Sequence, residues 1–304
     1  MSKTVLITGA TGKQGGSVVS AILEQNADVE ILAVTRDSNS TGAQKLKSKS
    51  PKIQLVEGNL DDPEGLFKNA QEITSQPIWG VYSVQVPVPG SSDQEAEERQ
   101  GKGLIDASLK HNVNFFVYSS VDRGGDASYD TATEIPHFIS KHHIEHHLVE
   151  QTKGTEMKWT ILRPAAFLDN ITPDFYGKVF TTSWKDVVKE KPLQVIAVSD
   201  IGYFAAQAFL NPEEWANKPL SLAGDEITFE EMATTFKDRT GRDVPLTFSF
   251  VLSSVLWVLK DFRYMFQWFH DSGFGADIST LKKMHPELKD FETWLVTESG
   301  LVSD

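Results

Sequence analysis

The sequence contains no cysteine among its 304 residues. It therefore forms no disulfide bond, has no thiolate nucleophile and offers no cysteine ligand to a metal ion. Positive charge is also scarce, because 29 lysines and arginines stand against 42 aspartates and glutamates, a net charge of −13. Binding to the phosphate backbone of nucleic acids or to an anionic membrane surface needs clustered cationic residues. We therefore expect no direct binding to nucleic acid or membrane, and expect any effect on transcription to run through a protein partner.

Long hydrophobic runs are missing as well. The most apolar stretch, Leu246–Leu259, is closed by Lys260 and Asp261, and it is shorter than the about 20 residues that a membrane-spanning helix needs. We predict a buried helix here, with a hydrophobic partner groove or a substrate lid as the alternative. A strand-like segment begins at Thr4 and leaves no room for a signal peptide. We expect an intracellular protein, located in the cytoplasm, with the nucleus as a second compartment.

Two catalytic signatures are absent. The sequence has no Gly-x-Ser-x-Gly motif, so a serine hydrolase has little support. It also has no P-loop, because Gly12-Lys13 lacks both the upstream glycine and a hydroxyl residue after the lysine.

Short strand-like runs alternate with helical patterns through the first half of the chain. The predicted strands are Thr4–Thr8, Glu30–Thr35, Ile53–Glu57, Gly80–Val84, Phe115–Ser119 and Trp159–Arg163. Helical segments separate most of them, at 16–25, 42–48, 63–70 and 93–112. This alternation predicts parallel strands joined by right-handed crossovers, and hence an α/β fold with a doubly wound parallel sheet.

The pattern changes after Pro164. We expect an aromatic-rich, irregular segment at 165–191, short strands at 193–198 and 220–223, and helices beyond Phe229. We therefore predict a nucleotide-binding domain over residues 1–164 and a smaller mixed lobe over 165–304, with segments near 193–205 returning to the sheet.

A glycine-rich loop follows the first predicted strand. Gly9 permits a tight turn, Gly12 lets the backbone approach a pyrophosphate, and Gly15 lets the following helix pack close to the strand. Free N–H groups at the start of that helix would face the phosphates. We assign to the cofactor the loop residues Gly9, Thr11, Gly12, Lys13, Gln14 and Gly15.

The end of the second predicted strand selects between dinucleotides. An acidic residue there would hydrogen-bond the ribose 2′-hydroxyl and repel a 2′-phosphate. This chain instead has Arg36, followed by Asp37. The planar guanidinium of arginine suits a phosphate group and can stack on adenine. We predict NADP(H) as the cofactor, with NAD(H) as the weaker alternative because Asp37 could serve the hydroxyl.

The ends of the next two predicted strands complete the cofactor set. Asn59 and Leu60 follow the third strand, where a polar and an apolar side chain can flank an adenine edge. Gln85 and Val86 end the fourth strand and are candidate neighbours of the inner ribose.

Several segments together resemble one protein family. They read TGATGKQGG, TRD, EGNLDDPEGL and TILRPAAFLDN, and later DIGYFAAQAFLNPEEW, GDEITFEEMA and HPELKDFETWL. In this order and spacing they resemble the NmrA-like family of atypical short-chain dehydrogenase/reductases. The resemblance implies a Rossmann fold with a small C-terminal lobe and a bound nicotinamide dinucleotide. It also implies that Pro164, Ala166 and Phe167 contact the carboxamide and that Asn170 lines the pocket.

The resemblance leaves two kinds of activity open. Hydride-transfer enzymes of this superfamily carry Tyr-x-x-x-Lys, and the matching segment here has His137 and Lys141. In those enzymes the lysine lowers the pKa of the tyrosine and holds the nicotinamide ribose, so the resemblance implies that Lys141 binds the cofactor and could keep a catalytic role. Ser119 matches a hydroxyl that polarises the substrate, but the tyrosine is gone. We favour a redox or nucleotide sensor that acts through a regulatory protein partner, as a monomer or homodimer. The alternative is an NADPH-dependent reductase of a carbonyl or quinone, with His137 as proton donor.

Three further clusters have ordinary structural interpretations. His142, His143, His146 and His147 form two pairs with the i, i+4 spacing of metal ligands, but no third ligand or general base is evident, so they predict a polar helix face and no metal site. Phe167, Phe175, Tyr176 and Trp184 would form either an aromatic wall at the nicotinamide or the core of the second lobe. The second aromatic cluster predicts lobe core, with the closing of a hydrophobic partner groove as the alternative; it comprises Met265, Phe266, Trp268, Phe269 and Phe274.

Overall fold

The computed structural model describes residues 3–85 and 95–302. Its strands are β1 (Lys3–Ile7), β2 (Val29–Thr35), β3 (Ile53–Glu57), β4 (Ile78–Ser83), β5 (Phe115–Ser119), β6 (Lys158–Pro164), β7 (Ala166–Phe167), β8 (Leu193–Ile196), β9 (Lys218–Leu222) and β10 (Asp225–Ile227). Its α-helices are α1 (Lys13–Glu24), α2 (Thr41–Lys47), α3 (Pro63–Ile73), α4 (Ala96–Lys110), α5 (Pro136–Gln151), α6 (Phe175–Ser183), α7 (Val198–Leu210), α8 (Pro212–Trp215), α9 (Phe229–Thr240), α10 (Ser249–Val258), α11 (Lys260–Asp271), α12 (Ile278–Met284) and α13 (Phe291–Thr297). Shorter helical turns are η1 (Gly125–Tyr129), η2 (Leu168–Asn170) and the π-helical η3 (Trp184–Val188).

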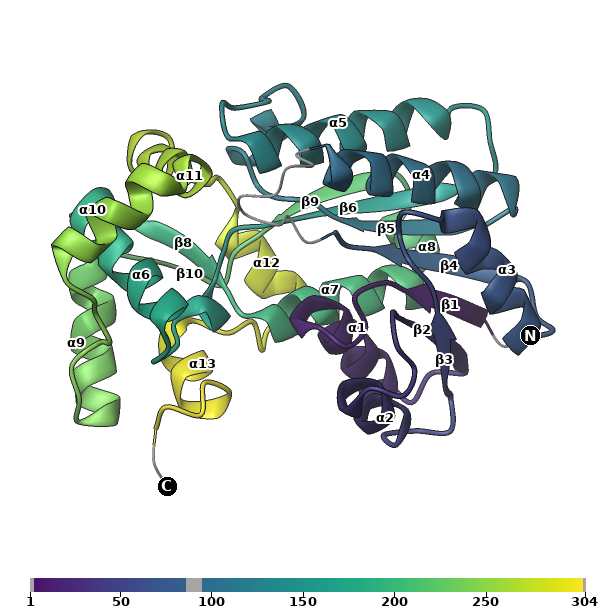
Figure 1. Ribbon diagram of the computed structural model, residues 1–304, viewed down its shortest axis with the longest axis horizontal. Helices are drawn as coiled ribbons and strands as arrows, with labels where there is room; N and C mark the ends of the chain where they lie inside the picture. The colour runs from purple at the N-terminus through teal and green to yellow at the C-terminus, as the bar shows by residue number, and fades with distance from the viewer. Residues whose placement is uncertain (1–2, 86–94, 303–304) are drawn as a thin grey trace. The chain divides into compact units, whose positions relative to one another are not determined.

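The large sheet has the strand order β3-β2-β1-β4-β5-β6-β9. Strands β1 to β6 pair in parallel, for example Ile7 with Ala33 across β1 and β2. The chain winds outward from β1 to β3 and then returns to add β4 on the other side of β1 (Figure 1). The doubly wound α/β prediction is confirmed. In such sheets ligands bind beyond the carboxyl ends of the strands, at the point where the winding reverses.

Helices cover both faces of this sheet. Apolar side chains of α3, α4 and α5, such as Phe67, Leu104 and Leu148, share one core with the strands. On the other face α7 packs against α1 so closely that a Cβ added at Gly202 would meet the carbonyl oxygen of Ser17 at 2.6 Å. Burial on both faces explains why these strands are nearly continuously apolar.

The chain divides into two compact units. One comprises residues 1–120, 140–163 and 201–220, and the other 121–139, 164–200 and 221–304. Within the predicted segment 193–205, β8 lies in the small sheet and residues from Ile201 onward belong to the unit of the large sheet. The boundary at residue 164 stays a prediction.

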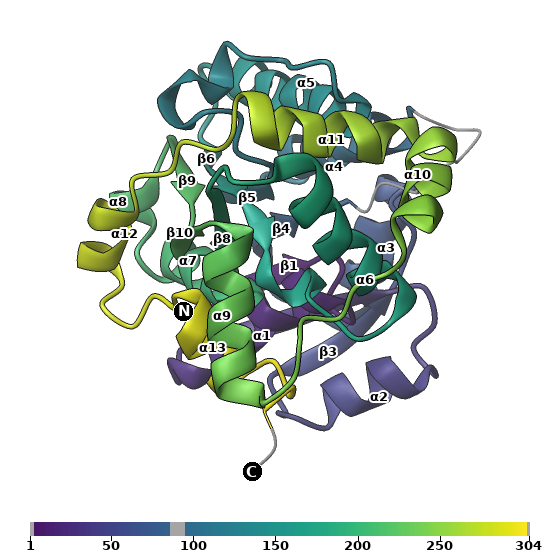
Figure 2. The same ribbon diagram turned by 90° about the vertical axis from the view of Figure 1, so that its left-hand side faces the viewer.

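The second unit is built on a three-stranded sheet of order β10-β8-β7. Helix α9 lies next to β8 and β10 (Figure 2). Its Met232 and Phe236 pack in a core that also contains Trp184 and Phe266. The prediction of an irregular segment at 165–191 is wrong, because it contains α6 and η3. Helix α6 begins where Asp174 accepts a hydrogen bond from the backbone N–H of Gly177 at 2.9 Å, which is the role of an N-cap.

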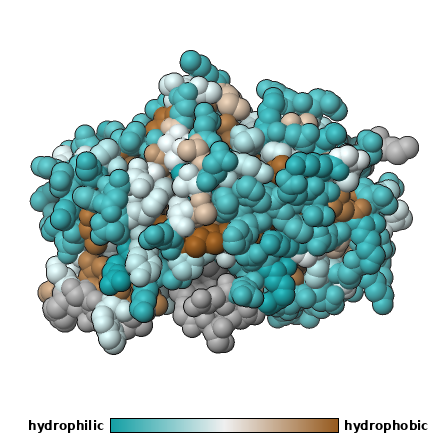
Figure 3. All heavy atoms as spheres, turned by 90° about the horizontal axis from the view of Figure 1, so that it is seen from above, coloured by the Kyte–Doolittle hydropathy of each residue, from teal (hydrophilic) through white to brown (hydrophobic). Residues whose placement is uncertain are grey.

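The apolar stretch Leu246–Leu259 contains α10, as predicted, but the helix is not buried throughout. Within the helix Leu252 is 3% exposed, whereas Trp257 is 78% exposed; Phe248, which precedes the helix, is 72% exposed. Composition predicts how apolar a helix is, but whether another element covers each of its sides depends on tertiary packing. No helix in the part of the chain that the structure describes is both long and apolar enough to span a bilayer. The face seen in Figure 3 is largely hydrophilic, with only small hydrophobic patches.

Candidate functional site

The glycine loop connects β1 to α1 through two close backbone contacts. Gly9 has φ of +60°, a conformation that favours glycine. The N–H of Gly12 donates to the carbonyl oxygen of Gly9 at 2.9 Å and closes the turn. A Cβ added at Gly15 would lie 2.4 Å from that same carbonyl oxygen, so only glycine lets α1 come this close.

The first turn of α1 has the properties of an anion site. Gly12 is the N-cap residue, so no side chain caps the first N–H groups, and the first turn contains no acidic residue. The exposed loop residues Thr11, Gly12 and Lys13 are accessible to a ligand. Unsatisfied N–H groups and the helix dipole both favour a negatively charged group here.

Gln14 joins this loop to two other strands. Its side-chain oxygen Oε1 accepts a hydrogen bond from the Ser119 hydroxyl at 2.6 Å and one from the Tyr82 hydroxyl at 3.4 Å. Ser119 ends β5 and Tyr82 lies in β4, and both residues are almost fully buried. Burial raises the pKa of Tyr82 above its ordinary value. No motif marks Tyr82, because it lies within a strand of mostly apolar residues.

The end of β2 presents Arg36 to solvent. Asp37 turns into its own loop, where its carboxylate accepts a hydrogen bond from the backbone N–H of Asn39 at 2.8 Å. The carboxylate of Glu57, at the end of β3, accepts one from the backbone N–H of Ser38 at 2.8 Å, and hydrogen bonding to Ser38 lowers the pKa of Glu57. The carboxylates of Asp37 and Glu57 therefore both accept hydrogen bonds from backbone N–H groups of the loop after β2.

The other predicted adenosine and ribose residues have varied environments. The side chain of Asn59 accepts a hydrogen bond from the N–H of Asp61 at 3.2 Å, and Leu60 packs on the core. Gln85 is 3% exposed and donates from Nε2 to the Ser83 hydroxyl at 2.9 Å. Among the residues that the structure describes, its Oε1 has no hydrogen-bond partner. Val86 lies outside the described residues.

Lys141 is held by an acidic residue that sequence reasoning missed. Its Nζ lies 2.8 Å from Oε1 of Glu97, on α4, and both side chains are almost completely buried. His137 precedes Lys141 by one helical turn but falls in the other unit, where its ring meets the edge of Phe138. Cooperation between His137 and Lys141 stays a prediction.

A second buried ion pair lies at the carboxyl ends of β5 and β6. Glu145 of α5 and Arg163 of β6 approach to 2.6 Å, and their side chains are 0% and 3% exposed. The hydroxyl of Ser120 also donates to Glu145. Nothing in the sequence marked this pair, because its members are 18 residues apart in different elements.

Four residues assigned by resemblance lie in the second unit. Pro164 ends β6, Ala166 and Phe167 form β7, and the exposed Asn170 ends η2. Their contacts with a nicotinamide carboxamide stay predictions.

The two aromatic clusters differ in how much of each is buried. Phe266 and Phe269 are buried, and Met265, Trp268 and Phe274 pack against them, so this predicted core is confirmed. In the other aromatic set Trp184 is buried in the same core, whereas Phe175 and Tyr176 are 53% and 80% exposed. These two therefore do not belong to the core of the second lobe.

The histidines of α5 form hydrogen bonds with acids of α4. His143 approaches Glu98 at 2.8 Å and His147 approaches Asp106 at 2.7 Å. Within residues 3–85 and 95–302 no group of three or more potential ligands has the geometry to hold a metal ion.

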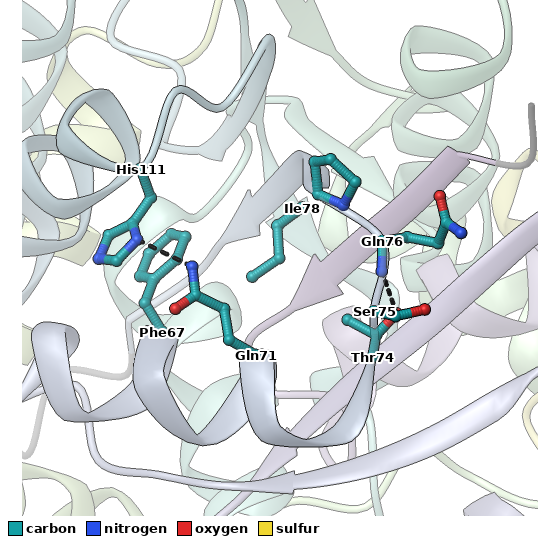
Figure 4. Close-up of a pocket in the computed structure, with 8 residues that line it drawn as sticks. Phe67, Gln71, Thr74, Ser75, Gln76, Ile78 and His111 are labelled. Carbon is teal, nitrogen blue, oxygen red and sulfur yellow. Dashed lines mark hydrogen bonds between the residues drawn. The ribbon is translucent and has the colours of Figure 1, made fainter.

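A surface depression lies elsewhere on the same unit (Figure 4). In it the His111 ring stacks on Phe67 with centroids 4.5 Å apart, and Gln71 hydrogen-bonds His111 at 3.2 Å. Ile78, which begins β4, also lines it. The depression is thus at the amino end of β4, whereas the glycine loop follows the carboxyl end of β1. It is separate from the candidate site.

The amino-acid sequence matches the model of one protein family over nearly its whole length. The model of the NmrA-like family matches residues 1–295. A relative from Aspergillus flavus, named an NmrA-like family domain-containing oxidoreductase, is 25% identical over 263 residues, covering 79% of this chain and 75% of its own.

Solved structures show the same fold. The Citrobacter triphenylmethane reductase complexed with NADP(H) has a TM-score of 0.71 at 18% identity, over 98% of this chain and 99% of its own. The negative transcriptional regulator NmrA in complex with NAD has a TM-score of 0.67 at 15% identity, over 99% and 96%.

Proposed function

Because this chain belongs to the NmrA-like family, we propose that it binds a nicotinamide dinucleotide, prefers NADP(H), and acts as a nucleotide sensor that regulates protein partners. The glycine loop carries the proposal. Gly15 lets α1 pack close to the backbone of Gly9. The first turn of α1, which no side chain caps, can then bind an anion at the carboxyl edge of the sheet. NADP(H)- and NAD-bound structures of the same fold support a dinucleotide as the ligand.

The preference for NADP(H) rests on the end of β2. Arg36 is exposed, while Asp37 and Glu57 are engaged by backbone N–H groups of the same loop. A 2′-phosphate would meet a guanidinium there, whereas the carboxylates of Asp37 and Glu57 each already accept a backbone hydrogen bond.

The sensor is favoured over an enzyme by the surroundings of Lys141. The residue four positions before it is histidine in place of tyrosine, and its ammonium group is paired with Glu97. A sensor needs a nucleotide that binds two states of the protein with different affinity. We therefore expect NADPH and NADP+ to bind with different dissociation constants.

The alternative is an NADPH-dependent reductase, which the names of the relatives favour. Hydride would pass from NADPH to a carbonyl or quinone, and the proton on the substrate oxygen would come from His137 or water. In that case Lys141 and Ser119 would serve the reaction.

Calorimetric titration with NADPH, NADP+, NADH and NAD+ tests the binding proposal. We expect the 2′-phosphorylated pair to bind more tightly, and Gly15→Ala to abolish binding because its Cβ would collide with backbone. Gly103→Ala, a glycine in helix α4 whose Cβ would come no closer than 3.3 Å to Pro63, should bind like the wild type. Failure of all four nucleotides to bind the wild type would overturn the proposal.

A turnover assay separates sensor from enzyme. For the sensor, NADPH oxidation across a panel of carbonyls and quinones should equal that of a protein-free control. Sustained oxidation that is lost in Lys141→Ala would establish the reductase instead.

A further inference from the structure

We propose that the side-chain amide of Gln14 binds the nicotinamide-side phosphate of the dinucleotide, and that Ser119 and Tyr82 are the residues that position it. This inference rests on the proposed dinucleotide binding and deepens it. It also gives Ser119 a different role from the polarising of a substrate carbonyl that family resemblance implies.

The hydrogen of Ser119 is already committed. A serine hydroxyl has one hydrogen to donate, and here it goes to Oε1 of Gln14 at 2.6 Å. Only lone pairs remain on the Ser119 oxygen. In this arrangement Ser119 can accept a hydrogen bond but cannot donate one to a substrate oxygen.

Gln14 has donors to spare. Both hydroxyls, of Ser119 and of Tyr82, donate to its Oε1, which fixes the plane of the amide. Its Nε2 then carries two N–H groups, and within the described residues no hydrogen bond from this nitrogen to protein occurs. Gln14 is only half-buried, so a ligand can reach this nitrogen.

The position of Gln14 points to a phosphate. It is the second residue of α1, beside the uncapped N–H groups of the first turn. Hydrogen bonds to an anionic oxygen are about twice as strong as neutral ones. Two hydroxyls that donate to the amide oxygen also polarise the amide and strengthen its N–H donors.

The direction in which the Gln14 side chain points indicates which of the two phosphates of the diphosphate it would bind. In the sheet order, β2 with Arg36 lies on one side of β1, and β4 and β5 lie on the other. Gln14 reaches toward β4 and β5, away from the end of the sheet where Arg36 would hold the adenosine 2′-phosphate. The phosphate nearer the nicotinamide is therefore the one within its reach.

Calorimetry with three ligands tests this assignment. NADPH contains both phosphates of the diphosphate, and so does 2′-phospho-ADP-ribose, which lacks the nicotinamide. Adenosine 2′,5′-bisphosphate lacks the nicotinamide-side phosphate. We expect Gln14→Ala to weaken NADPH and 2′-phospho-ADP-ribose equally, by about tenfold, and the bisphosphate by less than about twofold.

Ser119→Ala should weaken the same two ligands by about threefold to tenfold. In a Gln14→Ala background it should have no further effect, because Ser119 acts through Gln14. Ser119→Thr keeps a hydroxyl and should restore binding. Ser108→Ala, which also removes one buried hydroxyl but in helix α4, should bind all three ligands like the wild type.

The outcomes distinguish this inference from the proposed function. If the wild type binds the ligands but Ser119→Ala binds both diphosphates normally, the inference is overturned and the proposed function stands. An equal loss from Ser119→Ala with and without Gln14 also overturns it. If the wild type binds none of the three ligands, both proposals are overturned.

Discussion

Arg36 and Asp37 are neighbours after the end of β2, but their side chains have different environments in the loop. The carboxylate of Asp37 accepts a hydrogen bond from Asn39, whereas the side chain of Arg36 is exposed. From sequence, Asp37 left NAD(H) open as an alternative cofactor. The loop geometry weakens that alternative, because a carboxylate that is bound to its own backbone is less available to a ribose hydroxyl.

Reversing the charge of Arg36 should change nucleotide preference. We expect Arg36→Glu to weaken NADPH by about 10- to 100-fold, through lost charged hydrogen bonds and repulsion of the 2′-phosphate, and to leave NADH within about threefold. Competitive binding of the two nucleotides measures this. Lys68→Glu makes the same change of charge at an exposed position of α3 and serves as control. Equal losses for both nucleotides would contradict the role of Arg36.

Histidines of α5 and acidic residues of α4 form hydrogen bonds where these two helices meet. His143 and Lys102 both pair with Glu98, and His147 pairs with Asp106. The sequence showed the histidines as a polar face of one helix. It did not show their partners, which lie more than 40 residues away along the chain.

These hydrogen bonds predict a pH dependence of stability. Burial acts to raise the pKa of Glu98, but the hydrogen bonds from Lys102 and His143 outweigh it and lower that pKa below its ordinary 4.5. A carboxylate with a lowered pKa stabilises the fold above its ordinary pKa and loses that contribution as the pH falls through the lowered value. Glu98→Gln should therefore be less stable than the wild type at pH 7, and the difference should vanish well below pH 4.5.

Urea unfolding of both proteins between pH 7 and pH 3 measures this difference. Glu150→Gln, at an exposed i,i+3 pair with Lys153, provides the control and should differ little from the wild type at any pH. A stability difference for Glu98→Gln that persists unchanged at pH 3 would argue against the ion pairs as its cause.

For the molecule as a whole, ligand binding should appear as thermal stability. A ligand that binds only the folded state at 100 times its dissociation constant adds about 2.7 kcal/mol, which for a chain of this size corresponds to a rise in melting temperature of about 5 °C. We expect this rise with NADPH in the wild type and none in Gly15→Ala. Differential scanning fluorimetry measures it, and tight calorimetric binding without any thermal shift would contradict folded-state binding.

The sequence alone determined the parts of this protein that depend on local chemistry. The runs at Ile53–Glu57 and Phe115–Ser119 match β3 and β5 residue for residue, because β-branched and aromatic residues favour strands and polar residues end them. The glycine loop was predictable because a positive φ at Gly9 and the close packing at Gly15 each demand glycine.

Tertiary structure decided what depends on partners distant in sequence. Gln14 and Ser119 are 105 residues apart, and only the pairing of β4 and β5 beside β1 brings them together. The packing of α4 against α5 likewise gives Lys141 its partner Glu97. Exposure of Trp257 depends on what covers α10, which no local pattern records. Residue types and spacing therefore determined the kind of site, whereas long-range packing determined which of its donor and acceptor atoms already have a protein partner.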